Sequence, residues 1–282
     1  EYHAAVKDWK SFSKMVEEEK RYVSDPLEKA TLLFEEGRYL HEIVGDLDAA
    51  IRNYRLALDA HPDHAGALKI TGSIFFERHE WEASRHSLER YLELFESEME
   101  EAEVGQMHYM LAFGYEQTGD DSEALKHYTA SYKIDANLLP TLEGLARTLF
   151  KRGDWERSFR VYQTILVRYR DKKSVPELVE LFCRLGEVNG KLGKDEMAAR
   201  MYEKALELAP ESVVAIKAIV KFYERLENWK KVLQYRGRLI KKLEGKDLAE
   251  QWRAVGDIYI DKLGDVDKGL EAAVATLHCV SS

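Results

Sequence analysis

The chain has 282 residues, of which 45% are apolar, 33% charged and 11% aromatic. An apolar share this high excludes a disordered chain, and no apolar run approaches the roughly 20 residues that span a bilayer. The net charge of −9 argues against general nucleic-acid binding, because that activity needs a basic face, and two cysteines 96 residues apart (Cys183 and Cys279) exclude a disulfide framework.

The chain begins EYHAAVKDWKSF, with neither Met nor an apolar leader segment. A start at Glu1 predicts a piece of a longer protein, whose targeting segment or membrane anchor would lie outside it. On the sequence given, we expect a cytoplasmic location and no direct insertion into a membrane.

A short turn followed by an apolar helix face recurs along the chain. Small or apolar residues stand at i, i+4 and i+8 after each turn, as at Ala50, Tyr54 and Leu58, which indicates one stripe of a helix. Each turn therefore predicts the second helix of a helix pair. In chain order the segments are GDLDAAIRNYRLAL from Gly45, HEWEASRHSLERYL from His79, GDDSEALKHYTASY from Gly119, GDWERSFRVYQTIL from Gly153, GKDEMAARMYEKAL from Gly193, ENWKKVLQYRGRLI from Glu227 and GDVDKGLEAAVATL from Gly264.

The segments before these turns carry small residues within a helical pattern. A glycine inside a helix costs about 1 kcal/mol relative to alanine, so its recurrence predicts close packing of the paired helices. The positions are Gly37, Gly72, Ala112, Ala146, Gly186 and Gly256. The five prolines fall between pairs or in first turns, where a missing N–H is tolerated.

A longer period is superimposed on the helix pairs. Trp9, Trp81, Trp155 and Trp229 are separated by 72, 74 and 74 residues, which indicates duplication of a module of two helix pairs. The turns at Gly45 and Gly264 come one residue late, so we expect the helices before them to be one residue longer.

These residues resemble the tetratricopeptide repeat (TPR) family, most closely in DLDAAIRNYRLALDAHP (46–62) and GKDEMAARMYEKALELAP (193–210). The resemblance implies an all-α, right-handed superhelical α-solenoid of antiparallel helix pairs, forming a single domain over 1–282. Its units are expected at 1–25 (partial), 26–64, 65–100, 101–138, 139–174, 175–212, 213–246 and 247–282. The atypical ends indicate a fragment of a longer bacterial-type array, or else a complete domain with irregular ends.

Signatures of enzymes are missing from the sequence: it has no G-x-G-x-x-G, P-loop, H-E-x-x-H or G-x-S-x-G motif. His61 and His64 flank Asp63 and could ligate a metal, but further ligands are not evident and an ordinary turn is the favoured interpretation. Cys183 is expected to pack or to line a groove, and His108 and His127 to be groove or surface residues. We therefore expect no catalytic residue, metal or cofactor.

In the TPR family the first helix of each pair lines the inner side of the superhelix, which places the partner site there. The inward positions of the N-terminal half are Phe34, Arg38, Phe76, Tyr109, Phe113, Arg147, Phe150 and Lys151, and those of the C-terminal half are Cys183, Glu187, Lys191, Lys217, Lys221, Arg225, Arg253 and Asp257. We hypothesise that this groove captures a peptide or helix with apolar anchors followed by acidic residues. The alternative is that the aromatic residues pack between helices and the basic residues are solvated.

Two functional classes follow from the resemblance: a non-catalytic protein-interaction scaffold, or a substrate-presenting region of a larger enzyme. The partners that the family implies include small GTPases and signalling, secretion or motility components. Nucleic acid is disfavoured because acidic residues interrupt the inner face at Glu116, Glu143, Glu187, Glu224 and Asp257. Binding of chaperone tails is also disfavoured, since no register supplies the Lys and Asn set that the family uses for it.

Overall fold

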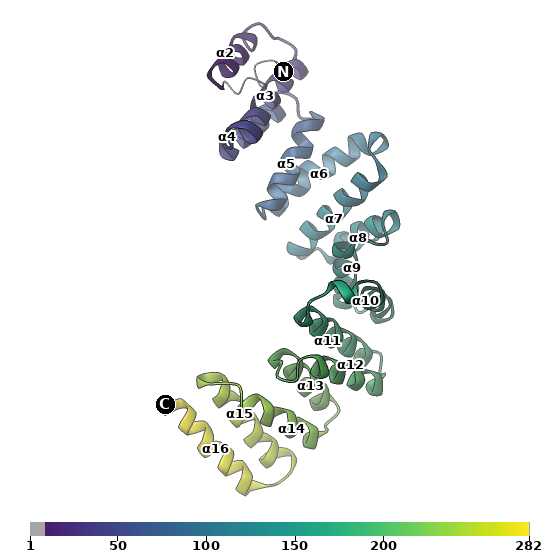
Figure 1. The fold of residues 1–282 in the computed structure, drawn as a ribbon, viewed down its shortest axis with the longest axis vertical. Coiled ribbons are helices and arrows are strands. Elements are labelled where there is room, and N and C mark those ends of the chain that lie inside the picture. The colour runs from purple at the N-terminus through teal and green to yellow at the C-terminus, as the bar shows by residue number, and fades with distance from the viewer. Residues whose placement is uncertain (1–8, 282) are drawn as a thin grey trace. The chain divides into compact units, whose positions relative to one another are not determined.

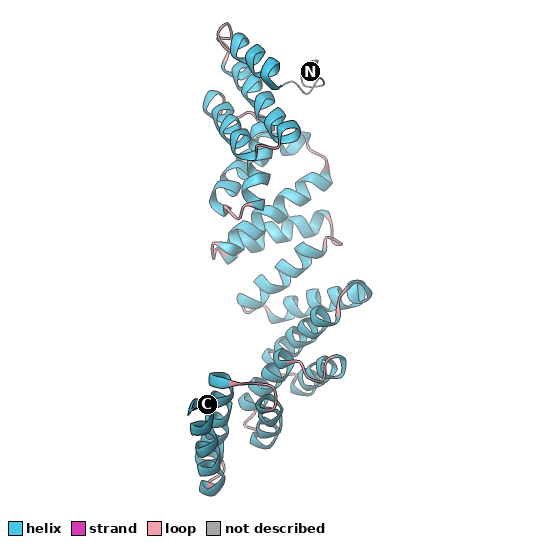
Figure 2. Cartoon of the chain, turned by 60° about the vertical axis from the view of Figure 1, so that its left-hand side comes forward, coloured by secondary structure: helices cyan, strands magenta, loops and turns pink. Residues whose placement is uncertain are grey.

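The computed structural model describes residues 9–281, and all the regular elements in that range are helices (Figures 1 and 2). In chain order they are α2 (Trp9–Glu19), α3 (Pro26–Tyr39), η1 (Leu40–Val44), α4 (Leu47–Ala60), α5 (Ala65–Glu77), α6 (Trp81–Phe95), η2 (Glu96–Glu98), α7 (Glu101–Gln117), α8 (Asp121–Ile134), α9 (Leu139–Lys151), α10 (Trp155–Tyr169), η3 (Arg170–Lys172), α11 (Val175–Lys191), α12 (Asp195–Leu208), α13 (Val213–Arg225), α14 (Trp229–Ile240), α15 (Gly245–Asp257), η4 (Ile258–Lys262) and α16 (Val266–Ser281).

The chain forms two compact units, of which unit 1 ends at Thr148 and unit 2 begins at Leu149, within α9. In unit 1 the hairpins are α3/α4, α5/α6 and α7/α8, and in unit 2 they are α11/α12, α13/α14 and α15/α16. Each hairpin packs against its neighbour in the same unit through the apolar stripes that the sequence shows. The expected all-α solenoid of helix pairs is thus confirmed. The expected repeat boundaries stay a prediction.

The turns between paired helices explain why the second helices begin where they do. Gly119 and Gly193 adopt left-handed φ angles of 85° and 71°, which glycine reaches without steric cost. The two turns that lack glycine use the same conformation, with His79 at 61° and Glu227 at 53°. Asp120 then accepts hydrogen bonds from the N–H groups of Ser122 and Glu123, so it caps α8.

The two late turns also have a structural explanation. α3 continues into the π-helical turn η1 before Gly45, and α15 continues into the π-helical turn η4 before Gly264. A π-turn accommodates one extra residue without displacing the rest of the helix. The expectation of one additional residue before Gly45 and Gly264 is therefore confirmed.

Small residues in the first helices bring the hairpin partners close together, as the sequence predicts. A Cβ atom built on Gly37 would lie 2.7 Å from Cε1 of Tyr54, and one on Gly186 would lie 2.8 Å from Cζ of Tyr202. Both tyrosines are buried, with 0% and 4% of their surface exposed. The aromatic rings of the second helices thus fill the space that the missing side chains leave, which gives each unit a close-packed core.

Candidate functional site

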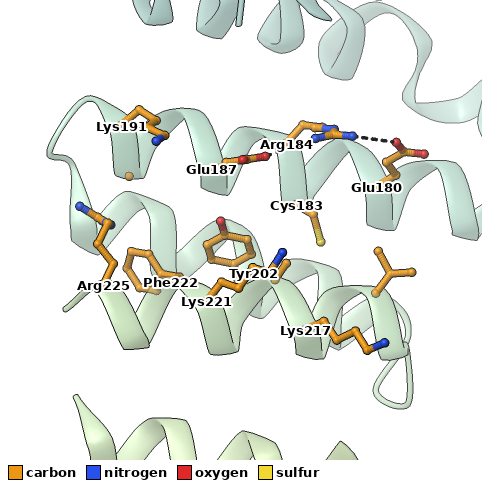
Figure 3. A pocket seen from close by; sticks show the side chains of 13 residues that line it. Glu180, Cys183, Arg184, Glu187, Lys191, Tyr202, Lys217, Lys221, Phe222 and Arg225 are labelled. Atoms are coloured by element: carbon orange, nitrogen blue, oxygen red, sulfur yellow. Dashed lines mark hydrogen bonds and ion pairs between the residues drawn. The ribbon is translucent and has the colours of Figure 1, made fainter. Parts of the chain in front are cut away.

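Unit 2 contains a pocket of about 520 Å³ between the first helices of two successive pairs, α11 and α13. The ring of Tyr202, from the second helix α12, lies between these two helices in Figure 3. Cys183 from α11 and Ala218 from α13 add apolar surface to the pocket. A concave space of this size with apolar surface and a few polar groups is typical of binding sites.

The α13 side of the pocket is basic and is only partly neutralised. Arg225 donates a hydrogen bond to Asp195 at 2.5 Å. Lys217 and Lys221, one helical turn apart, make no ion pair within the part of the chain that the structure describes. These two ammonium groups are therefore available to an acidic ligand.

The α11 side of the pocket is nearly neutral. Arg184 lies 3.3 Å from a carboxylate oxygen of Glu187 and 3.7 Å from one of Glu180, so one cation serves two carboxylates (Figure 3). Lys191, at the end of α11, lies with its Nζ atom 5.6 Å from the centre of the Trp155 ring. The charge of the pocket is thus set mainly by α13.

Two ionisable side chains in the pocket are held in their neutral forms. Burial raises the pKa of the Cys183 thiol to about 11, which leaves little thiolate at neutral pH. Burial likewise raises the pKa of Tyr202 above its ordinary value, with a contribution from the nearby Glu187 carboxylate. The pocket can therefore donate hydrogen bonds from Tyr202, and its cysteine lacks the activation of a nucleophile.

The predicted aromatic positions of unit 1 pack mainly against other side chains. Phe34 lies 5.0 Å from the ring of His64, and a Cβ atom built on Gly66 would lie 2.7 Å from Phe34. Phe76 makes edge-on contacts with Trp81, Tyr109 and Phe113 at ring distances of 5.6, 6.2 and 5.7 Å. These rings join neighbouring helices, which is the packing alternative considered from the sequence.

The remaining predicted residues fall into four settings. Arg38 pairs with Glu35 at 3.1 Å, and Arg147 bonds the buried Glu116, so both are neutralised within unit 1. Phe150 lies edge-on against Trp155, next to Lys151 at the end of α9. The structure brings one group together in the pocket: Cys183, Glu187, Lys191, Lys217, Lys221 and Arg225. Arg253 and Asp257 lie on α15.

Sequence reasoning missed seven of the residues that line the pocket: Glu180, Arg184, Gly190, Tyr202, Val214, Ala218 and Phe222. Tyr202 stands at the position equivalent to Tyr54 in the apolar stripe of its helix, so the sequence pattern indicates only packing for it. Gly190 could have been found from the 74-residue period, because the position 74 residues earlier holds Glu116.

The histidine pairs of unit 1 differ in their roles. Nδ1 of His64 accepts a hydrogen bond from the N–H of Ala67 and so caps α5, and Asp63 binds Arg90 at 2.8 and 2.9 Å. His64 and Asp63 therefore stabilise the turn before α5. His108 and His127, expected to be groove or surface residues, are both half-buried between α7 and α8, where their Nδ1 atoms lie 2.9 Å apart and 12% of the His127 side chain is exposed. In the described residues no three His, Cys, Asp or Glu side chains form a cluster suited to a metal ion.

A membrane-crossing helix would need a long apolar stretch, and none of the helices within residues 9–281 has one.

Models of known families match two segments of the chain. Both matches are described as tetratricopeptide repeat, at residues 44–98 and 138–211. The chain belongs to the tetratricopeptide repeat family. Members of this family act in protein–protein interaction, and the TPR match at 138–211 covers all of α11 and α12, which form one side and the base of the pocket.

Two relatives of this TPR protein are similar in sequence. One is a CTR9 homologue of Arabidopsis thaliana, 26% identical over 238 residues, which are 81% of this chain and 20% of that protein. The other is the photosystem I assembly protein Ycf3 of Prochlorococcus marinus subsp. pastoris, 28% identical over 136 residues, which are 44% of this chain and 73% of that protein. The TPR chain thus spans about a fifth of the length of the Arabidopsis relative.

A solved structure shares the fold. The crystal structure of YrrB, described as a TPR protein with an unusual peptide-binding site, has a TM-score of 0.57 and 20% identity, covering 73% of this chain and 96% of YrrB. This likeness supports the TPR fold of the chain.

Proposed function

We propose that this TPR protein is a non-catalytic scaffold that binds a segment of a partner protein against its first helices. The observation that carries the proposal is the pocket between α11 and α13, which Lys217 and Lys221 line without an ion pair to any carboxylate of residues 9–281. The expected ligand has an apolar anchor followed by acidic residues. The anchor would contact Cys183 and Ala218, and the acidic residues would meet the α13 side.

The relatives support a binding role. Ycf3 is by its name an assembly protein, and YrrB is described by its peptide-binding site. The alternative, a substrate-presenting region of a larger enzyme, would use the same pocket, with the catalytic groups elsewhere in the parent protein. In both cases this chain supplies binding rather than chemistry, which agrees with the raised pKa of Cys183.

The proposal is tested by selecting a random twelve-residue peptide library on the intact chain and measuring the affinity of the recovered peptides by fluorescence anisotropy. The substitution Ala218→Trp would fill the pocket from α13 and is expected to abolish binding. Arg200→Trp, on the exposed surface of α12, is the control and should leave binding unchanged. Peptides that bind the Ala218→Trp variant as well as the original chain would contradict the proposal.

A further inference from the structure

The three consecutive helices α7, α8 and α9 share one register with the later helices α11, α12 and α13. α7 and α11, α8 and α12, and α9 and α13 each begin and end 74 residues apart: 101–117 with 175–191, 121–134 with 195–208, and 139–151 with 213–225. Every residue around the unit 2 pocket therefore has a counterpart 74 positions earlier. Comparing the pocket residues with these counterparts shows which side chain of the earlier set is missing from the pocket.

In unit 1 the corresponding place is filled by a carboxylate of the chain itself. Glu116, only 8% exposed, accepts a hydrogen bond from the hydroxyl of Tyr128 at 2.7 Å. Arg147 donates to the same carboxylate from Nε and Nη2, both at 3.0 Å. A buried charge is tolerated here because its oxygens are bonded by a hydroxyl and a guanidinium.

In unit 2 the donors are kept and the carboxylate is gone. The counterparts of Glu116, Tyr128 and Arg147 are Gly190, Tyr202 and Lys221, and all three line the pocket. Tyr202 is 4% exposed overall, and its hydroxyl makes no hydrogen bond within the described part of the chain; unlike the hydroxyl of Tyr54, it is not fully shielded, so it opens into the pocket. A hydroxyl that opens into the pocket beside the unpaired ammonium of Lys221 leaves both donors available to a group supplied from outside.

We infer that the unit 2 pocket binds the carboxylate of an Asp or Glu side chain of a partner protein, in the place that Glu116 occupies in unit 1. The carboxylate accepts hydrogen bonds from the hydroxyl of Tyr202 and the ammonium of Lys221. The inference rests on the proposed function, since it requires that a protein segment enter this pocket.

The surroundings of Gly190 fit a negative group. A Cβ atom built on Gly190 would lie 3.1 Å from Nη2 of Arg225, so a second cation borders the vacated space. Glu187, one turn away, is paired with Arg184. A nearby change enlarges the pocket, because Cys183 stands where unit 1 has the larger Tyr109. The thiol and Ala218 leave room for an apolar side chain beside the bound carboxylate.

The test uses peptides selected from the random twelve-residue library on the intact chain. We expect them to contain Asp or Glu next to an apolar residue. Replacing that acid by Asn or Gln should lower the affinity about tenfold or more, as should Tyr202→Phe and Lys221→Met, since hydrogen bonds to charged groups are strong. Tyr128→Phe, the matched change in unit 1, should leave the affinity unchanged.

A second measurement needs no peptide. Gly190→Glu restores the carboxylate in the chain, and the atoms nearest to its Cβ would be the flexible end of Arg225 and the edge of Phe222. We expect this variant to melt at a higher temperature than Gly190→Gln and to lose peptide binding. Equal melting temperatures of Gly190→Glu and Gly190→Gln would overturn the inference.

The outcomes separate this inference from the proposed function. Peptides that lose binding on Ala218→Trp but tolerate Tyr202→Phe and the loss of their acidic residue would overturn the carboxylate site and leave the scaffold proposal standing. Recovery of no peptide, or of peptides indifferent to Ala218→Trp, would overturn the proposed function and this inference with it.

Discussion

Arg225, the last residue of α13, donates a hydrogen bond at 2.5 Å to Asp195, the first residue of α12 and 30 positions earlier. The same step joins Arg78 to Asp48 at 2.6 Å in unit 1. The hairpins between these junctions use tryptophan instead: Trp81 contacts Phe113, Trp155 contacts Lys191 and Trp229 contacts Lys262. Two kinds of contact between hairpins thus recur along the chain, which gives the 74-residue spacing of the tryptophans a structural reason.

The close approach of α11 and α12 predicts opposite effects for two glycine substitutions in unit 2. A methyl group on Gly186 would lie 2.8 Å from the ring of Tyr202, so Gly186→Ala is expected to destabilise the unit by about 1–3 kcal/mol. Gly237, within α14, has no atom within 4 Å of a built Cβ, and Gly237→Ala should stabilise by about 0.5–1 kcal/mol. Denaturant midpoints would check both, and two shifts in the same direction would refute the packing argument.

Arg147 and Lys221 occupy equivalent positions, but only Arg147 has a carboxylate partner among the described residues, Glu116. Removing the two cations should therefore change the free energy of unfolding by different amounts. Arg147→Met removes a donor from the buried carboxylate of Glu116 and is expected to cost about 1–3 kcal/mol in the free energy of unfolding. Lys221→Met, 74 residues later, removes a cation without an ion pair to a described residue and should change stability by less than about 0.5 kcal/mol. Thermal melting of the two variants compares them directly. Similar losses would mean that Lys221 has an internal carboxylate partner.

Acid should weaken the α7/α8 hairpin through His127. Burial, and then the neighbouring His108, lower the pKa of His127 to about 4, against 6.5 in the unfolded chain. The folded form therefore binds this proton less readily, so the stabilisation is complete above pH 6.5 and is lost as the pH falls towards 4. The expected loss is about 2–3 kcal/mol across that window.

The contact between the two imidazoles explains this direction. Their Nδ1 atoms lie 2.9 Å apart, so one ring must donate and the other accept, and two protonated rings would present donor to donor. Glu123, 3.9 Å from His127, opposes the shift, and Lys126 adds to it. Melting temperatures at pH 7 and pH 4.5 should differ less for His127→Gln than for the original chain. An equal difference would assign the acid sensitivity to other groups.

The sequence predicted the helices, the turns and the two late turns well, because these depend on local rules: small residues where helices meet, left-handed turn positions and capping side chains. Local rules could not predict which basic side chains on the inner helix face form ion pairs. Arg225 and Lys221 occupy the same helix face, yet only Arg225 meets a carboxylate, and that carboxylate, Asp195, is 30 residues away. The contact between His108 and His127 escaped prediction for the same reason, since the relative rotation of α7 and α8 decides it.

The last prediction concerns the salt dependence of partner binding. Lys217→Glu/Lys221→Glu reverses both unpaired charges of the α13 side and should weaken binding of an acidic library peptide at least tenfold at low salt. It should also flatten the dependence of affinity on ionic strength, because screened attraction between opposite charges would no longer contribute. Anisotropy titrations between about 50 and 500 mM NaCl cover screening lengths from longer to shorter than the pocket.

The control variant Arg200→Glu/Lys230→Glu makes the same change in net charge at exposed positions of α12 and α14. If this control variant lost affinity and salt dependence to the same degree, the overall charge of the chain, and not the pocket, would be responsible.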